Sequence, residues 1–258
     1  MRGNLFREKG SPAPLPKSTR TKGQKAKSLI YIQTKSALRE LLSYNLKIDK
    51  NSVRYGCMNA TFQINGLVIE TERLILRPFE AADLNDFYEY ASVEGVGEMA
   101  GWRHHESIAK SQEILDIFIK EDKTFAIVLK ENNKVIGSLG IEKYGMEHTL
   151  TEFEGYQGRE IGYVLSKSYW GKGLMPEAVS AVIRYLFDNL HFDFLLCGYY
   201  DFNKQSKRVQ EKCGFKPYRK LVMDTRMGTA EPGVLNLLIN PNKNISFVFS
   251  HPETLIYQ

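Results

Sequence analysis

The chain has 258 residues, of which 43% are hydrophobic and 25% are charged, a composition typical of globular proteins. No stretch approaches the roughly 18 apolar residues that a membrane-spanning helix needs. Three cysteines, Cys57, Cys197 and Cys213, follow neither a metal-ligand nor a redox spacing, and their odd, small number argues against a disulfide framework. The composition therefore excludes an integral membrane protein, a metal centre and a disulfide scaffold, and it predicts a reducing, cytoplasmic location.

Positive charge is concentrated at the N-terminus. Residues 1–66 contain 13 Lys or Arg against 3 Asp or Glu, a formal charge of +10, whereas residues 67–258 contain 22 against 27, a charge of −5. The Pro-rich and basic run over 11–27 cannot bury enough apolar surface to offset its ordering entropy. We expect a basic, disordered extension over 1–66, with a short amphipathic helix over 28–46. Three interpretations of this extension remain: a nucleic-acid-binding tail, a transit peptide, or a non-native extension upstream of Met58.

Residues 67–240 carry the patterns of a single α/β domain, followed by a tail over 241–258. The expected strands cover 67–77, 124–129, 135–141, 159–165, 194–200, 215–226 and 233–239. The expected helices cover 83–92, a segment opening at Glu106 or Ser107, a segment beginning near Pro176, and 203–213 closed by Gly214. Because the second and third strands form a hairpin, we predict a mixed, mostly antiparallel sheet flanked by helices.

The most informative segment joins the fourth expected strand to the helix near Pro176. It reads Trp170-Gly171-Lys172-Gly173-Leu174-Met175. A Gly-rich loop between a strand and a helix directs backbone N–H groups and the positive helix end at one spot, which is an anion site. Lys172 adds a cation. The alternative is an ordinary turn, and neither the Walker nor the dinucleotide glycine pattern is present.

A second polar segment begins the last helix. Asn203 and Ser206 lie between a strand end and the first helical turn, where they could cap the helix or bind an amide-rich ligand. The residues that follow, 211–215, read Glu-Lys-Cys-Gly-Phe. By itself this segment leaves capping and ligand binding both open.

Together these segments resemble the GCN5-related N-acetyltransferase (GNAT) superfamily, in particular its ribosomal-protein-alanine acetyltransferase-like branch. The resemblance runs from about Ile69 to about Leu238, and it depends on the order and spacing of several motifs. These are Thr71-Glu72-Arg73-Leu74-Ile75-Leu76-Arg77-Pro78, Gly162-Tyr163-Val164-Leu165, Gly171-Lys172-Gly173-Leu174-Met175, Glu177-Ala178, and Asn203 and Ser206 with Glu211-Lys212-Cys213-Gly214-Phe215. The sequence departs from the family pattern at Trp170, where Gln or Arg is usual, and at Met175, where a small residue is usual.

The resemblance implies acetyl-CoA as acyl donor, no metal, and a primary amine as acceptor. In the family the strand matching 159–165 separates from the strand matching 194–200, and the pantetheine lies between them. The resemblance then implies backbone contacts at Val164 and Leu165, the pyrophosphate on the amides of residues 170–175, and pantetheine contacts at Asn203 and Ser206. These residues agree with the anion site inferred from the loop itself.

Catalysis requires a neutral amine, a donor for the developing oxyanion and a proton for the thiolate. The resemblance makes Glu160 the candidate base, and a backbone N–H near Val164 the candidate oxyanion donor. Tyr200 and Tyr218 are candidates to approach the sulfur. His104, His105 and His148 lie in loops at the expected acceptor entrance, and Cys213 lacks the accompanying base of a thiol nucleophile.

The acceptor is expected to enter between residues 94–105 and 145–158. Carboxylates in or beside these segments predict an acidic mouth, which would attract a cationic amine such as a ribosomal-protein N-terminus, a free amino acid, a polyamine or an aminoglycoside. A non-catalytic acyl-CoA-binding or regulatory module is the alternative to an active enzyme. Nucleic acid is expected as a partner only if the basic extension is functional, and the chain is expected to be a monomer or homodimer.

Overall fold

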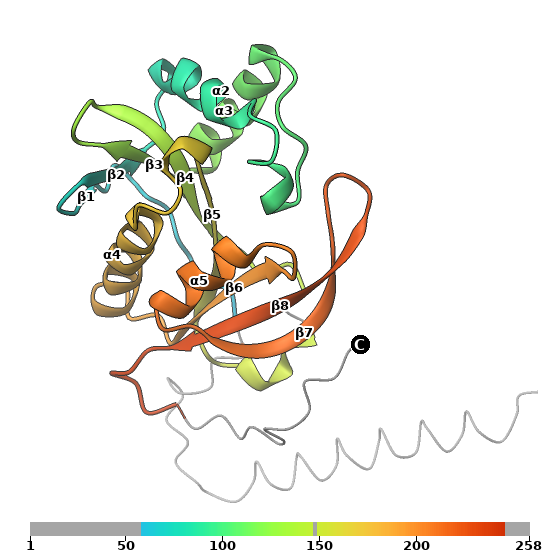
Figure 1. Cartoon of the computed structure of the whole chain (residues 1–258). Coiled ribbons are helices and arrows are strands. Elements are labelled where there is room, and N and C mark those ends of the chain that lie inside the picture. The colour runs from blue at the N-terminus through green and yellow to red at the C-terminus, as the bar shows by residue number, and fades with distance from the viewer. Residues whose placement is uncertain (1–57, 147–148, 246–258) are drawn as a thin grey trace, which may run out of the picture. The chain divides into compact units, whose positions relative to one another are not determined.

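The computed structural model describes residues 58–146 and 149–245, in which eight strands form one mixed sheet (Figure 1). The strands are β1 (Ile69–Glu70), β2 (Leu74–Pro78), β3 (Thr124–Leu129), β4 (Lys134–Glu142), β5 (Gly158–Leu165), β6 (Phe194–Tyr200), β7 (Lys216–Asp224) and β8 (Ala230–Ile239). The α-helices are α2 (Leu84–Ala91), α3 (Ile108–Glu121), α4 (Leu174–Asp188) and α5 (Lys204–Lys212). The predicted α/β class with a mostly antiparallel sheet is confirmed. The expected helix over 28–46, the residues 246–258 of the tail and His148 lie outside the described residues.

The sheet order is β1-β2-β3-β4-β5-β6-β8-β7, and only β5 and β6 are parallel neighbours. β5 pairs with β4 along most of its length, from Glu160 opposite Glu142 to Leu165 opposite Gly137. Its pairing with β6 ends after three residues, at Glu160 opposite Leu196. Beyond Glu160, β5 therefore has a strand partner on one side only, and the sheet opens between β5 and β6.

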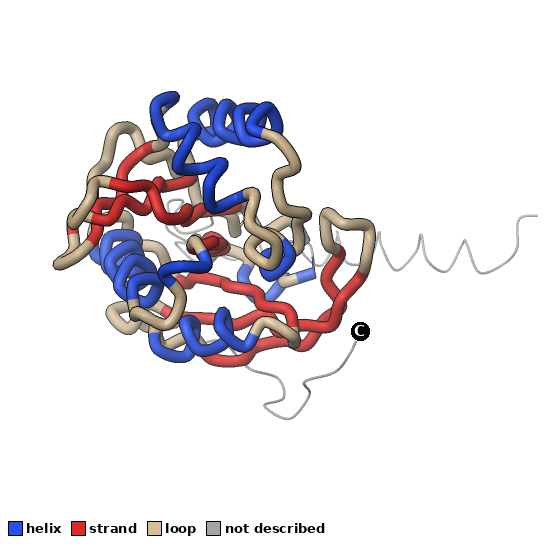
Figure 2. The backbone as a smooth tube through the Cα atoms, turned by 45° about the horizontal axis from the view of Figure 1, so that its top comes forward, coloured by secondary structure: helices blue, strands red, loops and turns tan. Residues whose placement is uncertain are grey.

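Helices cover both faces of the sheet, as Figure 2 shows with helices in blue and strands in red. α4 packs on one face against a core that includes Leu74, Leu76 and Leu195. α2 and α3 pack on the opposite face, against Ala126 and Val128 of β3. The side chains of β5 alternate between these two environments, as expected for a strand with helices on each side. Among the described residues, no helix has the length and apolar character of a membrane span.

The first strand prediction, 67–77, is wrong in detail, because the structure divides it into β1 and β2. The hydroxyl of Thr71 accepts a hydrogen bond from the N–H of Leu74 (2.9 Å), and the backbone N–H of Thr71 donates to the carbonyl of Leu74 (2.9 Å). Such a local side-chain hydrogen bond stabilises a turn at the expense of a continuous strand. The turn places Arg73 at the edge of the sheet, next to the start of α4.

Residues 58–66, which the sequence analysis placed in the extension, belong to the folded domain. Met58, Ala60, Phe62 and Ile64 are buried. The N–H of Gly158 donates to the carbonyl of Met58 (2.8 Å), and the N–H of Ala60 donates to the carbonyl of Gly158 (3.0 Å). The folded region therefore starts before the expected boundary between residues 66 and 67.

Helix α4 begins two residues before the expected start at Pro176. Its N-cap is Gly173, which has a φ of 78°. Pro176 then occupies the third helical position, where a missing N–H removes no intrahelical hydrogen bond. The loop before the helix is consequently shorter, and its last glycine is part of the helix start.

Candidate active site

A cavity of about 470 Å³ lies where β5 and β6 separate. Its lining residues come mainly from β5, the loop before α4 and the first turn of that helix, β6, helix α5, the 3-10 turn at Glu98–Ala100 and Met223 of β7. Most of the expected cofactor residues lie along it, namely Val164, Leu165, Trp170, Gly171, Gly173, Leu174, Met175, Asn203 and Ser206. The structure thus brings together two sequence segments that are more than 25 residues apart.

The end of the cavity at the start of α4 has the features of an anion site. Gly171 and Gly173 have φ values of 76° and 78°, a left-handed conformation that favours glycine. The N–H groups of the first turn of α4 have no intrahelical partner, and the helix dipole adds positive potential at this end. Lys172 was expected to add a cation to the anion site, but it does not line the cavity. Its ammonium lies 5.0 Å from the centre of the Tyr169 ring instead.

The edge of β5 that faces the gap is formed by the backbone groups of Tyr163 and Leu165. The N–H of Ser166, the residue after β5, donates to the carbonyl of Ile136 in β4 (2.7 Å). Because backbone direction alternates along a strand, Val164 also turns its N–H and C=O toward β4, away from the gap. The ring N–H of Trp170 donates to the carbonyl of Leu165 (2.7 Å). Tyr163 rather than Val164 therefore presents its backbone groups to the gap, and Val164 borders the cavity with its side chain.

Asn203 and Ser206 have well-defined partners at the start of α5. Asn203 caps the helix by accepting the N–H of Ser206 (2.9 Å), and its amide donates to the carbonyl of Met99 (2.8 Å). The hydroxyl of Ser206 lies 3.0 Å from the hydroxyl of Tyr163 and accepts from Gln210 (3.1 Å). The capping role is thus present, and the same side chains connect α5 with β5 and with the turn at residues 98–100.

Two cations on α5 line the cavity and were not singled out from the sequence. Arg208 and Lys212 are four residues apart, so they share one face of the helix. A basic helix of this kind is usually read as a solvated face, and only the fold places it beside the anion site. Cys213, the residue after Lys212, contacts the carbonyl of Pro176 in the first turn of α4 (3.6 Å), so this helix ends beside the start of α4.

Glu160 lies at the point where the β5–β6 pairing ends, and its carboxylate borders the cavity. Burial raises the pKa of Glu160 to about 7, and the neighbouring carboxylate of Glu142 adds to this rise. The N–H of Gly198 donates to the Glu160 carboxylate and opposes the rise. A carboxylate with this pKa can accept a proton near neutral pH, which is the property required of a general base.

The space beside Glu160 is open because two glycines border it. A Cβ built on Gly162 would meet no atom within 4 Å, and one on Gly198 would lie 3.3 Å from the sulfur of Met223 and 3.6 Å from Oε1 of Glu160. Gly162, Val164 and Gly198 fall on the same side of the sheet as Glu160 by strand alternation. The remaining wall on this side is largely apolar, formed by Val96, Met99, Ala100, Tyr200 and Met223.

The expected acidic mouth does not line this cavity. Among the described residues that border it, Glu160 is the only carboxylate. Glu98 instead holds its own loop together: although burial opposes the change, hydrogen bonds from the backbone and ring of His104 and from the N–H of Gly95 lower the pKa of Glu98 to about 2. Glu152 accepts hydrogen bonds from Tyr218 and from Arg219 (2.6 Å).

The other candidate side chains occupy structural positions. His105 is buried against the hydroxyl of Ser111 (2.7 Å), and burial lowers its pKa. Burial raises the thiol pKa of both Cys197 and Cys213, which disfavours the thiolate. Tyr200 borders the cavity, whereas Tyr218 does not. No group of three or more metal-ligating side chains occurs within residues 58–146 and 149–245.

Comparisons with known proteins agree with this geometry. The model of the acetyltransferase (GNAT) domain family matches residues 73–216. YnaD of Bacillus subtilis strain 168, described as an uncharacterized N-acetyltransferase, is 28% identical over 153 residues, which are 57% of this chain and 82% of YnaD.

Two solved structures share the fold. A GNAT-family acetyltransferase from Bacillus anthracis has a TM-score of 0.59 at 23% identity, covering 67% of this chain and 99% of its own. The ribosomal-protein-S5-alanine acetyltransferase from Vibrio fischeri has a TM-score of 0.53 at 21% identity, covering 68% and 98%. Since the family model spans more than half of the sequence, the chain belongs to the GNAT family of acetyltransferases.

Proposed function

We propose that the chain transfers the acetyl group of acetyl-CoA to a primary amine that enters the cavity beside Glu160. The observation that carries this proposal is the end of β5–β6 pairing at Glu160, which opens a single cavity between an anion site and a carboxylate. The diphosphate of the donor would bind the N–H groups of residues 171–175, since the N–H of Trp170 already donates to the carbonyl of Lys167 (3.2 Å). The pantetheine would follow the free edge of β5 at Tyr163 and Leu165, with Ser206 and Asn203 on the opposite side.

The reaction is a direct displacement. The amine nitrogen attacks the thioester carbonyl carbon, a C–N bond forms, the C–S bond breaks, and the sulfur leaves as a thiolate that takes a proton from solvent. Glu160 takes the proton that the amine loses, and its raised pKa suits this role near neutral pH. A backbone N–H on the gap edge of β5 would stabilise the negative charge that develops on the carbonyl oxygen.

The cavity walls favour an amine attached to a small or apolar group. Met99, Ala100 and Met223 offer no hydrogen bonds from their side chains, and Glu160 is the one carboxylate among the described lining residues. A polyamine or an aminoglycoside carries several positive charges, each of which needs a carboxylate or solvent. A peptide N-terminus that begins with a small or apolar residue satisfies both conditions. The Vibrio fischeri neighbour is named for acetylating an alanine of a ribosomal protein, which agrees with this choice.

A thiol-release assay with acetyl-CoA tests the proposal. The amine panel contains a peptide with an N-terminal alanine, spermidine and an aminoglycoside, and mass spectrometry identifies the acetylated product. We expect release of CoA with the peptide to exceed that with either polycation. Saturable acetyl-CoA binding without CoA release for a broad set of amines would instead support the non-catalytic acyl-CoA-binding module.

A further inference from the structure

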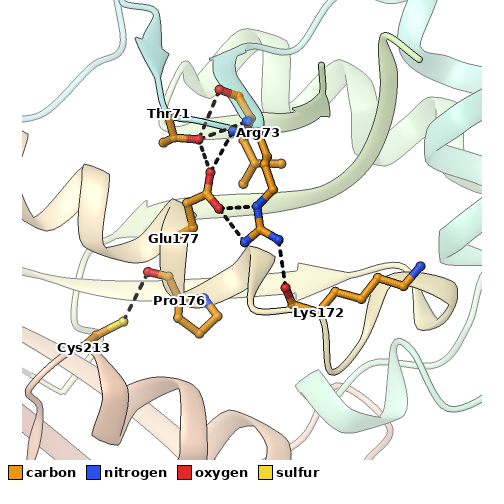
Figure 3. A network of polar contacts seen from close by, with 7 residues as sticks. Thr71, Arg73, Lys172, Pro176, Glu177 and Cys213 are labelled. Atoms are coloured by element: carbon orange, nitrogen blue, oxygen red, sulfur yellow. Dashed lines mark hydrogen bonds and ion pairs between the residues drawn. The ribbon is translucent and has the colours of Figure 1, made fainter. Parts of the chain in front are cut away.

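Arg73 joins the turn between β1 and β2 to the start of helix α4 (Figure 3). Its Nε donates to Oε2 of Glu177 (2.7 Å), and Nη2 lies 2.6 Å from the same oxygen. Its backbone N–H donates to Oε1 of Glu177 (2.9 Å). Its Nη1 donates to the carbonyl of Lys172 (3.0 Å), within the Gly171–Gly173 loop. One guanidinium therefore contacts both the helix start and the glycine loop.

Glu177 creates an electrostatic difficulty at this position. It lies in the first turn of α4, beside the N–H groups that the anion site uses. A carboxylate there stabilises the helix dipole but repels an incoming diphosphate. Thr71 and Arg73 surround it with donors, including the Thr71 hydroxyl at 2.5 Å from Oε1. Although burial opposes the change, these hydrogen bonds lower the pKa of Glu177, so the group is ionised and its charge is matched by Arg73.

The contact is not needed to hold the two elements together. Leu74 and Leu76 of β2 pack with Val179 and Val182 of α4 in the same buried core. The side chain of Arg73 is 43% exposed, so solvent screening reduces what its ion pair with Glu177 adds to stability. The main effect of the contact is therefore on the charge and conformation of the Gly171–Gly173 loop.

We propose that Arg73 is a positioning residue for the acyl donor. It neutralises Glu177 and anchors the carbonyl of Lys172, so that the N–H groups of the Gly171–Gly173 loop remain directed at the diphosphate. This inference rests on the proposed function, because it concerns the acetyl-CoA end of the same cavity. Its effect should be confined to donors that carry a diphosphate.

The test compares two acyl donors with the full chain. For Arg73→Ala we expect the KM for acetyl-CoA to rise about tenfold while kcat at saturating donor changes little, since one charge-assisted contact is lost. S-acetylpantetheine lacks the diphosphate, so its kcat/KM should be the same in the variant and the wild type. Arg73→Lys keeps the charge but loses the fork and should fall between the two.

A double variant separates charge from folding. Arg73→Ala/Glu177→Gln removes the Glu177 charge together with its partner, and we expect it to recover part of the acetyl-CoA affinity. Lys134→Ala, which removes a surface ion pair with Glu89 (2.6 Å), is the control and should leave both donors unaffected.

Equal losses for the two donors, or a KM for acetyl-CoA within twofold of wild type in Arg73→Ala, would overturn the inference. No turnover by the wild-type chain with either donor would instead overturn the proposed function, and this inference with it.

Discussion

The two ends of the cavity are built in different ways. The donor end consists mainly of backbone: the N–H groups of the first turn of α4, two left-handed glycines and the free edge of β5. The acceptor end consists of side chains from segments that are distant in sequence, with Glu160 on β5, Met99 in a loop and Met223 on β7. A site built from backbone groups can therefore be recognised from a local sequence motif, whereas a site built from side chains depends on tertiary packing.

The acceptor end should be the more sensitive to loss of one functional group. For Glu160→Gln we expect kcat to fall by about 10² or more, because the variant cannot accept the amine proton. The Kd for acetyl-CoA should remain within twofold, since Glu160 lies beyond the donor's diphosphate site. Steady-state kinetics and calorimetry measure the two quantities, and Glu131→Gln, at an exposed residue in the turn between β3 and β4, is the control. An unchanged kcat would remove Glu160 from the chemistry.

Filling the open space beside Glu160 should have the next largest effect. Gly162→Leu places a side chain where no atom lies within 4 Å of the added Cβ, so the fold should tolerate it. We expect kcat/KM for the amine to fall by roughly 10- to 30-fold, because the side chain occupies the path to the thioester. Gly145→Leu, in an exposed loop with equally open space, is the matched control. Full activity in Gly162→Leu, with an unchanged melting temperature, would place the acceptor elsewhere.

The donor end should respond to backbone strain. Gly173→Ala forces a non-glycine residue into a φ of 78°, at a cost of about 1 kcal/mol. We expect the Kd for acetyl-CoA to rise by roughly fivefold with little change in kcat. Gly66→Ala has the same strain, with a φ of 77° in a turn away from the cavity, and should leave the Kd unchanged. Equal Kd values for the two variants would argue against the loop as the diphosphate site.

The smallest expected effect is a shift of the pH profile. A base must be deprotonated to act, and the pKa of Glu160 is about 7, so kcat/KM should rise with pH up to about 7 and then level. Glu142→Gln removes a neighbouring negative charge that contributes to the raised pKa, so the profile should move to lower pH by less than about one unit. A shift to higher pH in this variant would contradict the assignment.

Sequence patterns predicted the fold well where local signals are strong. The hairpin at 124–141, the strand 194–200 and the helix beginning at Asn203 follow from alternation, turns and a cap. The division of 67–77 was missed because it depends on the Thr71 hydroxyl, and the burial of 58–66 because the segment joins a strand that is distant in sequence.

In the candidate site, too, the residues predicted from the sequence are those with a local signal. The Gly171–Gly173 loop was found because its chemistry is in its own backbone. The roles of Arg208, Lys212, Met223 and Gly162 could not be seen, since each depends on where β5, β6, α5 and β7 meet. The expected acidic mouth does not line the cavity, because Glu98 binds His104 and Gly95 of its own loop and Glu152 binds Arg219 of the distant strand β7.

Calorimetric titration of acetyl-CoA into the full chain and into Glu160→Gln tests the division between the two ends most directly. We expect saturable binding at one site with a Kd that agrees within twofold between the two proteins, together with loss of acetyl transfer in the variant alone. Absence of saturable binding in a folded wild-type sample, or binding that the substitution abolishes, would contradict this division.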